Sequence, residues 1–113
     1  MQTITDEYMR EMLAKTKAYC LMILKKGPRL SEPGSDKVIW EHGRRNFALR
    51  AEGILAIVCP VRDDSDVAGL GIFNASVDEV DRLLRDDPAV REGVLRYELH
   101  PCRSFPGDQL PKG

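Results

Sequence analysis

Hydrophobic residues follow two different periods along the chain, and each change of period marks an expected boundary between elements. Runs or alternations of strand length, which predict β-strands, lie at residues 18–24, 54–61, 69–73 and 94–99. Apolar positions at helical spacing, which predict helices, lie at residues 6–17, 36–52 and 76–86. The expected order is therefore helix, strand, helix, strand, strand, helix and strand.

Capping residues support the expected helix boundaries. Thr5 is the expected N-cap of the first helix, and Asp36 that of the second. Ser76 and Glu79 form the capping-box pattern, in which hydroxyl and carboxylate satisfy free backbone amides at the start of the third helix. Gly53 stands where a left-handed residue would end the second helix.

This order after the leading helix predicts an α+β, ferredoxin-like βαββαβ fold, with an antiparallel sheet and two helices on one face. Pro101 is expected to end the last strand. The domain is expected at residues 18–103, after an N-terminal helical extension at 1–17 and before a flexible tail at 104–113. Because the second face of such a sheet would be uncovered, we expect a homodimer, with the extra N-terminal helix helping to cover the seam.

Composition and charge narrow the functional classes. The chain has 113 residues, of which 42% are hydrophobic and 31% charged, as expected for one globular domain. The 17 basic and 18 acidic residues leave no basic excess, which disfavours nucleic-acid binding. The apolar runs are too short to span a bilayer, and the amino terminus lacks the pattern of a secretory signal. We therefore expect a cytoplasmic protein with neither a membrane nor a nucleic-acid partner.

No cofactor or metal site is expected. Cys20, Cys59 and Cys102 are widely spaced and odd in number, which favours reduced thiols over a disulfide framework or a zinc site. Residues 63–66 are acidic, but the glycine and closing glutamate of a calcium loop are missing, so a solvated turn is expected. The sequence also lacks a nucleotide-binding loop and a flavin motif.

His42 is the main candidate for chemistry. At helical spacing it shares a face with Ile39, Asn46 and Leu49, which is expected to meet the sheet or a cleft. An imidazole there could exchange a proton near neutral pH. The alternative is a structural histidine whose ring is satisfied by Asn46 or a backbone carbonyl.

Asp87 is the candidate partner of this histidine. Because it directly precedes Pro88, it is also an expected helix N-cap, and a capping carboxylate can still orient an imidazole through its other oxygen. Arg44 and Arg45 follow His42 and could each meet a carboxylate, although one of the two must point largely into solvent.

Further residues are candidates for lining a substrate cleft. His100 could supply a second polar group, and Arg29 could hold an anionic group, unless the basic residues after the first strand only protect a sheet edge. Cys59 would need a nearby base or a helix N-terminus to act as a nucleophile. Trp40 and Phe47 form an aromatic stripe, interpreted as dimer or core packing.

Residues 18–103 resemble the YCII-related domain family of small YciI-like proteins. The segments that carry the resemblance are Lys26-Gly27-Pro28-Arg29, His42, Glu52-Gly53, the strand ending at Pro60, Gly69-Leu70-Gly71-Ile72-Phe73, Asp86-Asp87-Pro88-Ala89-Val90, Gly93 and His100-Pro101. The resemblance implies a dimeric α+β barrel built from two ferredoxin-like domains, and a catalytic pair at His42 and Asp87. A few relatives resemble cofactor-free enzymes acting on ring compounds such as chlorinated hydroxyquinols or lactones.

Two departures from the family pattern fall near the expected cleft. Cys59 replaces a glycine and Asn46 replaces an apolar residue, changes that could retune the substrate or mark lost chemistry. Two functions stay open. One is a cofactor-independent lyase or isomerase that moves a proton on a small cyclic or carbonyl compound, with Asn46, Cys59, Arg29 and His100 as substrate-binding residues. The other is a noncatalytic module that binds a small ligand or a partner protein.

Overall fold

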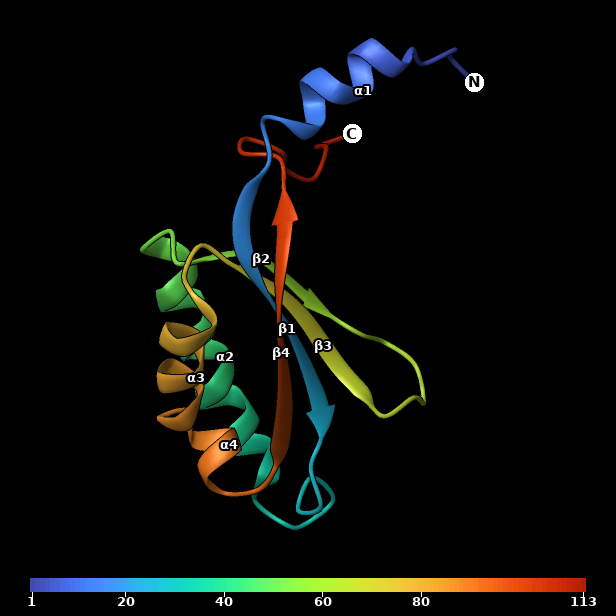
Figure 1. Cartoon of the computed structure of the whole chain (residues 1–113). Helices are drawn as coiled ribbons and strands as arrows, with labels where there is room; N and C mark the ends of the chain where they lie inside the picture. Colours follow the sequence, from blue (N-terminus) through green and yellow to red (C-terminus); the bar gives the residue numbers. More distant parts are fainter.

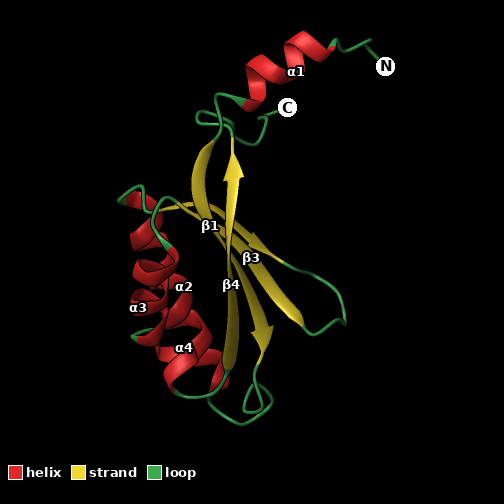
Figure 2. Cartoon of the chain, in the orientation of Figure 1, coloured by secondary structure: helices red, strands yellow, loops and turns green.

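The computed structural model describes all 113 residues as a four-stranded antiparallel sheet with helices on one face. The elements in chain order are α1 (Asp6–Leu13), β1 (Lys17–Lys26), α2 (Ser35–Ala51), β2 (Leu55–Pro60), β3 (Val67–Phe73), α3 (Val77–Arg85), α4 (Pro88–Arg91) and β4 (Leu95–Ser104). The strands lie in the order β2-β3-β1-β4, so β2 and β4 form the edges. Figures 1 and 2 show α2, α3 and α4 together on one side of the sheet. The α+β ferredoxin-like fold is confirmed; the sheet of one chain is open and does not close into a barrel.

The core lies between the sheet and its helices. Alternate residues of β1, namely Cys20, Met22 and Leu24, are buried on the helix side, where Phe73 of β3 is also fully buried. The apolar face of α3 covers them with Val80 and other buried side chains. This two-layer packing fixes the positions of α2 and α4, which carry the residues discussed below.

The other face of the sheet has no helix over it. The intervening residues of β1 and β3 lie on this open face, and their apolar side chains are Tyr19, Leu21, Ile23, Leu70 and Ile72. They are half-buried, except that Leu70 is 38% exposed. The part of the open face over β1 and β3 is therefore apolar and uncovered within the chain, whereas β4 contributes the polar side chains of Arg96, Glu98 and His100 to the same face.

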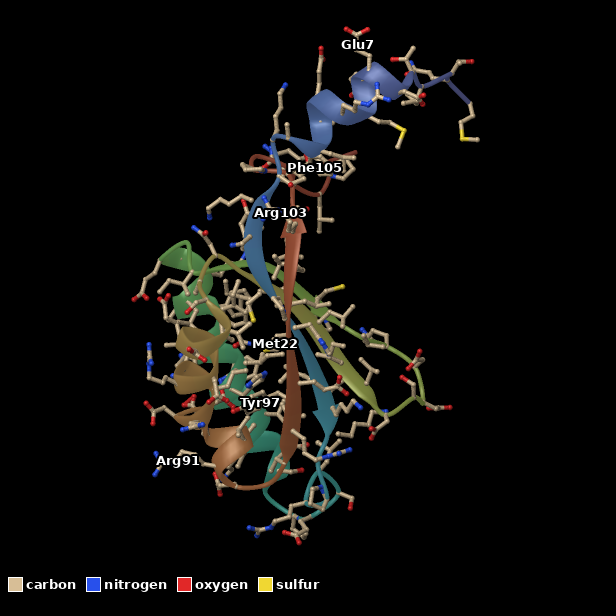
Figure 3. All side chains as sticks on the ribbon, viewed as in Figure 1. Glu7, Met22, Arg91, Tyr97, Arg103 and Phe105 are labelled. Atoms are coloured by element: carbon tan, nitrogen blue, oxygen red, sulfur yellow. The ribbon has the colours of Figure 1, made fainter.

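Helix α1 projects away from the sheet. The Thr5 side chain caps it by accepting a hydrogen bond from the Tyr8 amide at 3.1 Å, as the sequence predicts. None of its residues is buried, and Figure 3 shows Glu7 on this helix far from Met22 at the centre of the sheet. The helix therefore covers no part of its own sheet. No helix in the chain combines the length and apolar character needed to cross a membrane.

The helix ends follow the sequence signals, with one correction. The capping box of Ser76 and Glu79 is present, and Gly53 has a left-handed φ of 78°. The prediction of Asp36 as the N-cap of α2 is wrong, because Gly34 occupies that position with φ of 90° and no side-chain cap. The Asp36 carboxylate instead lies in the first turn, where the helix dipole favours it.

The prediction that Pro101 ends the last strand is also wrong, since β4 continues to Ser104. Pro101 pairs with Cys20 of β1 in the antiparallel ladder. Because β4 is an edge strand, one side of it has no neighbouring strand, so a residue without an amide proton is tolerated there.

Candidate functional site

A cavity of about 300 Å³ lies between α2 and the helix-facing side of the sheet. Its lining residues are Met22, Leu24, Ile39, His42, Gly43, Asn46, Phe47, Leu55, Val58, Cys59, Pro60, Ala68, Gly69, Leu70 and Leu95. No lysine, arginine, aspartate or glutamate is among them, and the polar side chains of its interior are those of His42 and Asn46. Such a cavity suits a small, mostly apolar ligand that is oriented by a few polar contacts.

Two of the three glycines near the cavity, Gly43 and Gly69, belong to its lining. A side chain at Gly71 would meet the Met22 Cε at 2.8 Å and the Leu55 Cδ1 at 3.1 Å, so those two residues fill the volume above it. At Gly69 the nearest atom to an added Cβ is the Cys59 backbone oxygen, at 3.2 Å. A Cβ at Gly43 of α2 would meet nothing within 4 Å. Gly43 and Gly69 therefore line the cavity without a side chain, whereas the space over Gly71 is already filled.

His42 and Asp87 are in direct contact. The imidazole Nδ1 lies 2.9 Å from Oδ1 and 3.0 Å from Oδ2 of the carboxylate. Asp87 is fully buried and His42 is 7% exposed. Because the pair is shielded from water, its hydrogen bond is stronger than the same contact on the surface would be.

Asp87 also has the capping role that its sequence predicts. Its Oδ2 accepts hydrogen bonds from the amides of Ala89 at 3.0 Å and Val90 at 3.3 Å, and so begins α4. These amides hold the carboxylate in place while it faces the imidazole. The capping and orienting roles coexist on one side chain.

The contacts of the imidazole define where its proton lies. A carboxylate accepts hydrogen bonds, so Nδ1 carries the proton of the neutral ring and donates it to Asp87. The Nε2 lone pair is then free to accept, and the Asn46 side-chain nitrogen donates to it from 3.1 Å. His42 and Asn46 both line the cavity, whereas Asp87 does not, so the basic edge of the ring faces the cavity.

One of the two arginines of α2 meets this carboxylate. Arg45 Nη1 lies 3.9 Å from Asp87 Oδ1, and the arginine side chain is 26% exposed. Arg44 is 68% exposed and pairs with Glu41, with 2.9 Å between its Nε and a carboxylate oxygen. The choice that the sequence left open therefore falls on Arg45.

Cys59 and Phe47 lie at the rim of the cavity. Strand alternation puts the Cys59 side chain on the face opposite to Val58 and Pro60, and the cysteine is exposed. No base contacts its thiol. Phe47 is 69% exposed and Trp40 is 71% exposed, so neither belongs to the core of the chain.

The remaining two predicted binding residues lie elsewhere. Arg29 is in the loop after β1, where its Nε donates to Glu32 at 2.8 Å, a bond that raises the pKa of the guanidinium. His100 pairs with Leu21 of β1 on the open face of the sheet, where its Nε2 lies 3.0 Å from Glu98. Neither side chain lines the cavity of His42 within this chain.

The acidic turn at residues 63–66 is organised by its own hydrogen bonds. Asp63 Oδ1 accepts from the amide of Ser65 at 2.9 Å and from its hydroxyl, and these bonds lower the pKa of the Asp63 carboxyl. No group of three or more His, Cys, Asp or Glu side chains anywhere in the chain is placed to hold a metal ion.

Gly43 and Gly69, which line the cavity, were not among the residues predicted from the sequence. Gly43 sits inside a helix, where glycine costs about 1 kcal/mol relative to alanine, and this local cost was a signal that its position has another use. Gly69 and Gly71 alternate on one face of a strand, which was a second signal of a missing side-chain layer.

Comparison with known proteins adds little. No protein-family model and no curated protein matches the chain. One similar solved structure is a 5-chloro-2-hydroxyhydroquinone dehydrochlorinase from Burkholderia phenoliruptrix AC1100 in complex with 2,5-dihydroxybenzoquinone. The sequences are 23% identical, the match covers 72% of this chain and 90% of that one, and the TM-score is 0.47. At that level the likeness carries no argument, and the fold assignment rests on the sheet topology described above.

Proposed function

We propose that this chain is a small YciI-like enzyme of the YCII-related kind, a lyase or isomerase that transfers a proton on a small ring or carbonyl compound without a cofactor. One observation carries the proposal. The buried Asp87 carboxylate holds the proton of His42 on Nδ1, at 2.9 Å, and leaves the Nε2 lone pair on the cavity side. A carboxylate-bound imidazole of this kind is held in one tautomer and one orientation, as a general base requires.

The proton transfer begins when a ligand takes the place of the Asn46 amide at Nε2. Nε2 accepts a proton from an acidic C–H or O–H of the ligand, and the resulting imidazolium is stabilised by Asp87. The same proton then returns, either to a second atom of the ligand, which gives an isomerase, or to a leaving group, which gives a lyase. Asn46, released from Nε2, is placed to bind a ligand hydroxyl or carbonyl oxygen.

The cavity defines the class of ligand. Its lining holds no charged side chain, so the ligand is neutral or carries its charge at the rim. Gly43 and Gly69 add no side chain to the lining, and a volume of about 300 Å³ corresponds to a ring compound with a few substituents. Cyclic enols, unsaturated lactones and hydroxyquinols meet these requirements.

Hydrogen–deuterium exchange tests the proposal without a known reaction. The protein would be incubated in heavy water with a panel of butenolides, cyclic enols and hydroxyquinols, and deuterium entry into ring C–H positions followed by NMR. We expect exchange above the uncatalysed rate for at least one compound, and a loss of about 100-fold or more in His42→Gln. His100→Gln is the matched control, because that histidine lies on the other face of the sheet. Equal exchange in His42→Gln and wild type would contradict the proposal.

A second function has one observation in its favour. The Asn46 amide already occupies Nε2, as it would in a module that binds a ligand through this edge and performs no chemistry. Such a module would bind a compound of the panel, seen as shifts of the Gly43 and Gly69 amide signals, and catalyse no exchange. Binding with exchange identifies the enzyme.

The proposal includes assembly as a homodimer through the open face of the sheet. The apolar side chains of β1 and β3 on that face have no cover within the chain, and a sheet with one such face normally packs against another layer. A second copy supplies a matching surface, because the same face meets itself across a two-fold axis. This arrangement would also place His100 in the interface.

A further inference from the structure

Arg45 is a largely buried cation whose environment is incomplete. Its Nη1 is buried and has no hydrogen-bond partner, and the nearest acceptor charge is Asp87 Oδ1 at 3.9 Å. Asp87 is fully buried and its two oxygens are already engaged by His42 and the amides that begin α4. The arginine is therefore held beside the carboxylate by charge more than by a hydrogen bond.

The charges of this group balance only when the imidazole is neutral. With neutral His42, the carboxylate and the guanidinium cancel, and the group has no net charge. A further proton, on Nε2 or on the carboxylate, would give it a net positive charge in a buried place, which is unfavourable. Without the guanidinium, the same proton would instead cancel the charge of Asp87 and would be taken up more readily.

We infer that Arg45 is a positioning residue whose charge opposes the binding of an extra proton by the His42–Asp87 pair, and so favours the neutral imidazole whose Nε2 lone pair is available to a ligand. The inference rests on the proposed function in one respect only, which is that the proposed reaction uses the Nε2 lone pair. Its direct consequence is a property of the resting protein, so it can be measured with no ligand present.

Few other charges face the pair. The side chains from the sheet that line the cavity around His42 are uncharged, and Arg91 of α4 is exposed. On the helix side of β4, Tyr97 donates to Asp81 of α3, which also pairs with Arg85, so that cluster is closed on itself. Asp87 has no other ion-pair partner than His42 and Arg45.

The test follows the protonation of Nε2 in the full-length ¹⁵N-labelled protein by long-range ¹H–¹⁵N correlation over a pH series, with the His42 signals assigned from His100→Gln. In Arg45→Gln and Arg45→Met we expect Nε2 to become protonated at a pH about one unit higher than in wild type. The extra proton can give either an imidazolium beside a carboxylate or a neutral imidazole beside a protonated carboxyl. Nε2 carries a proton in both forms, so its signal reports either one.

Matched variants separate charge from packing. Arg44→Gln, next along the helix, should match wild type because Arg44 pairs with Glu41 at the surface. Arg45→Lys, which keeps the charge, should stay closer to wild type than either uncharged variant. Glutamine and methionine pack differently but both lack the charge, so equal shifts in both identify charge as the cause, and thermal unfolding identifies any variant that does not fold.

Two results would overturn the inference. One is an unchanged protonation of Nε2 in a folded uncharged variant, and the other is a shift in Arg45→Lys as large as in Arg45→Gln. Failure of the proposed function looks different. It would be an absence of His42-dependent exchange in the ring-compound panel, whatever the NMR of the resting protein shows.

Discussion

The Nδ1 atom of His42 lies 2.9 Å and 3.0 Å from the two carboxylate oxygens of Asp87, although 45 positions separate these residues along the chain. The contact joins the middle of α2 to the residue that caps α4. It exists because both helices pack on the same face of the sheet (Figure 2). The orientation of the imidazole therefore depends on the packing of the helix layer.

Removing the Asp87 carboxylate should destabilise the fold. Asp87→Ala deletes an N-cap, worth about 0.5–2 kcal/mol, and leaves the buried His42 Nδ1 without its acceptor, at a cost of about 1–3 kcal/mol. We expect a loss of about 2–4 kcal/mol in the free energy of unfolding, measured by urea denaturation. Asp86→Ala, next to it and exposed, should change the free energy by less than about 0.5 kcal/mol. Similar losses in both variants would show that the buried contact contributes no more to the free energy of unfolding than an exposed side chain does.

A side chain added at Gly43 should raise the stability of the fold and weaken ligand binding in the cavity. Gly43→Ala adds a methyl group to the cavity lining, where nothing lies within 4 Å of it, and should raise the free energy of unfolding by about 0.5–1 kcal/mol. The same methyl group should weaken binding of flat ring compounds. Ala48→Gly, exposed on the same helix, should lose about that much stability without affecting binding. Unchanged binding in Gly43→Ala would contradict the placement of the ligand in this cavity.

The open sheet face should determine the oligomeric state. Ile72 lies on that face between Leu21 of β1 and Ile57 of β2. We expect sedimentation equilibrium to give a dimer for the wild type and a monomer for Ile72→Lys, because a buried unpaired charge opposes association. Trp40→Ala is the control for a rival interface on α2, and should remain dimeric. A monomeric wild type, or a dimer that is lost only in Trp40→Ala, would refute this interface.

Acid should weaken the fold partly through Glu98. Hydrogen bonds from Lys25 and His100 lower the pKa of its carboxyl below the ordinary 4.5. The ionised form is favoured in the folded state, so the stabilisation is present above pH 4.5 and is lost as the pH falls through the lowered folded value. As the pH falls through this window, the urea midpoint of Glu98→Gln should therefore decline less steeply than that of wild type. Glu7→Gln, on the projecting α1, should leave the pH dependence of the midpoints unchanged, and equal slopes in all three proteins would refute the account.

Local signals determined most of the fold. The hydrophobic periods predicted every long helix and all four strands, and the capping box of Ser76 and the left-handed Gly53 were read correctly. The error at Pro101 arose where tertiary context overrides a local rule. Pro101 is tolerated inside β4 because that strand is an edge, and edge position depends on the pairing of distant segments.

The site was predictable only in part, because local spacing identifies the face of a helix but not the contacts made by distant segments. Helical spacing put His42 and Asn46 on one inward face, and both are buried there. The sequence could not decide between Arg44 and Arg45, because the difference depends on how α2 is rotated against α4. It also grouped His100 with the cleft, whereas the register of β4 with β1 puts this side chain on the opposite face of the sheet.

The measurement that tests the central claim most directly is the tautomer of His42, read from long-range ¹H–¹⁵N spectra at mildly alkaline pH in wild type and Asp87→Asn. The contact with Asp87 predicts one neutral tautomer in the wild type, with the proton on Nδ1 and a bare Nε2. In Asp87→Asn, whose amide can both donate and accept, this preference should be reduced or lost. A wild-type ring protonated on Nε2, or an Nδ1–H preference unchanged in Asp87→Asn, would contradict the account.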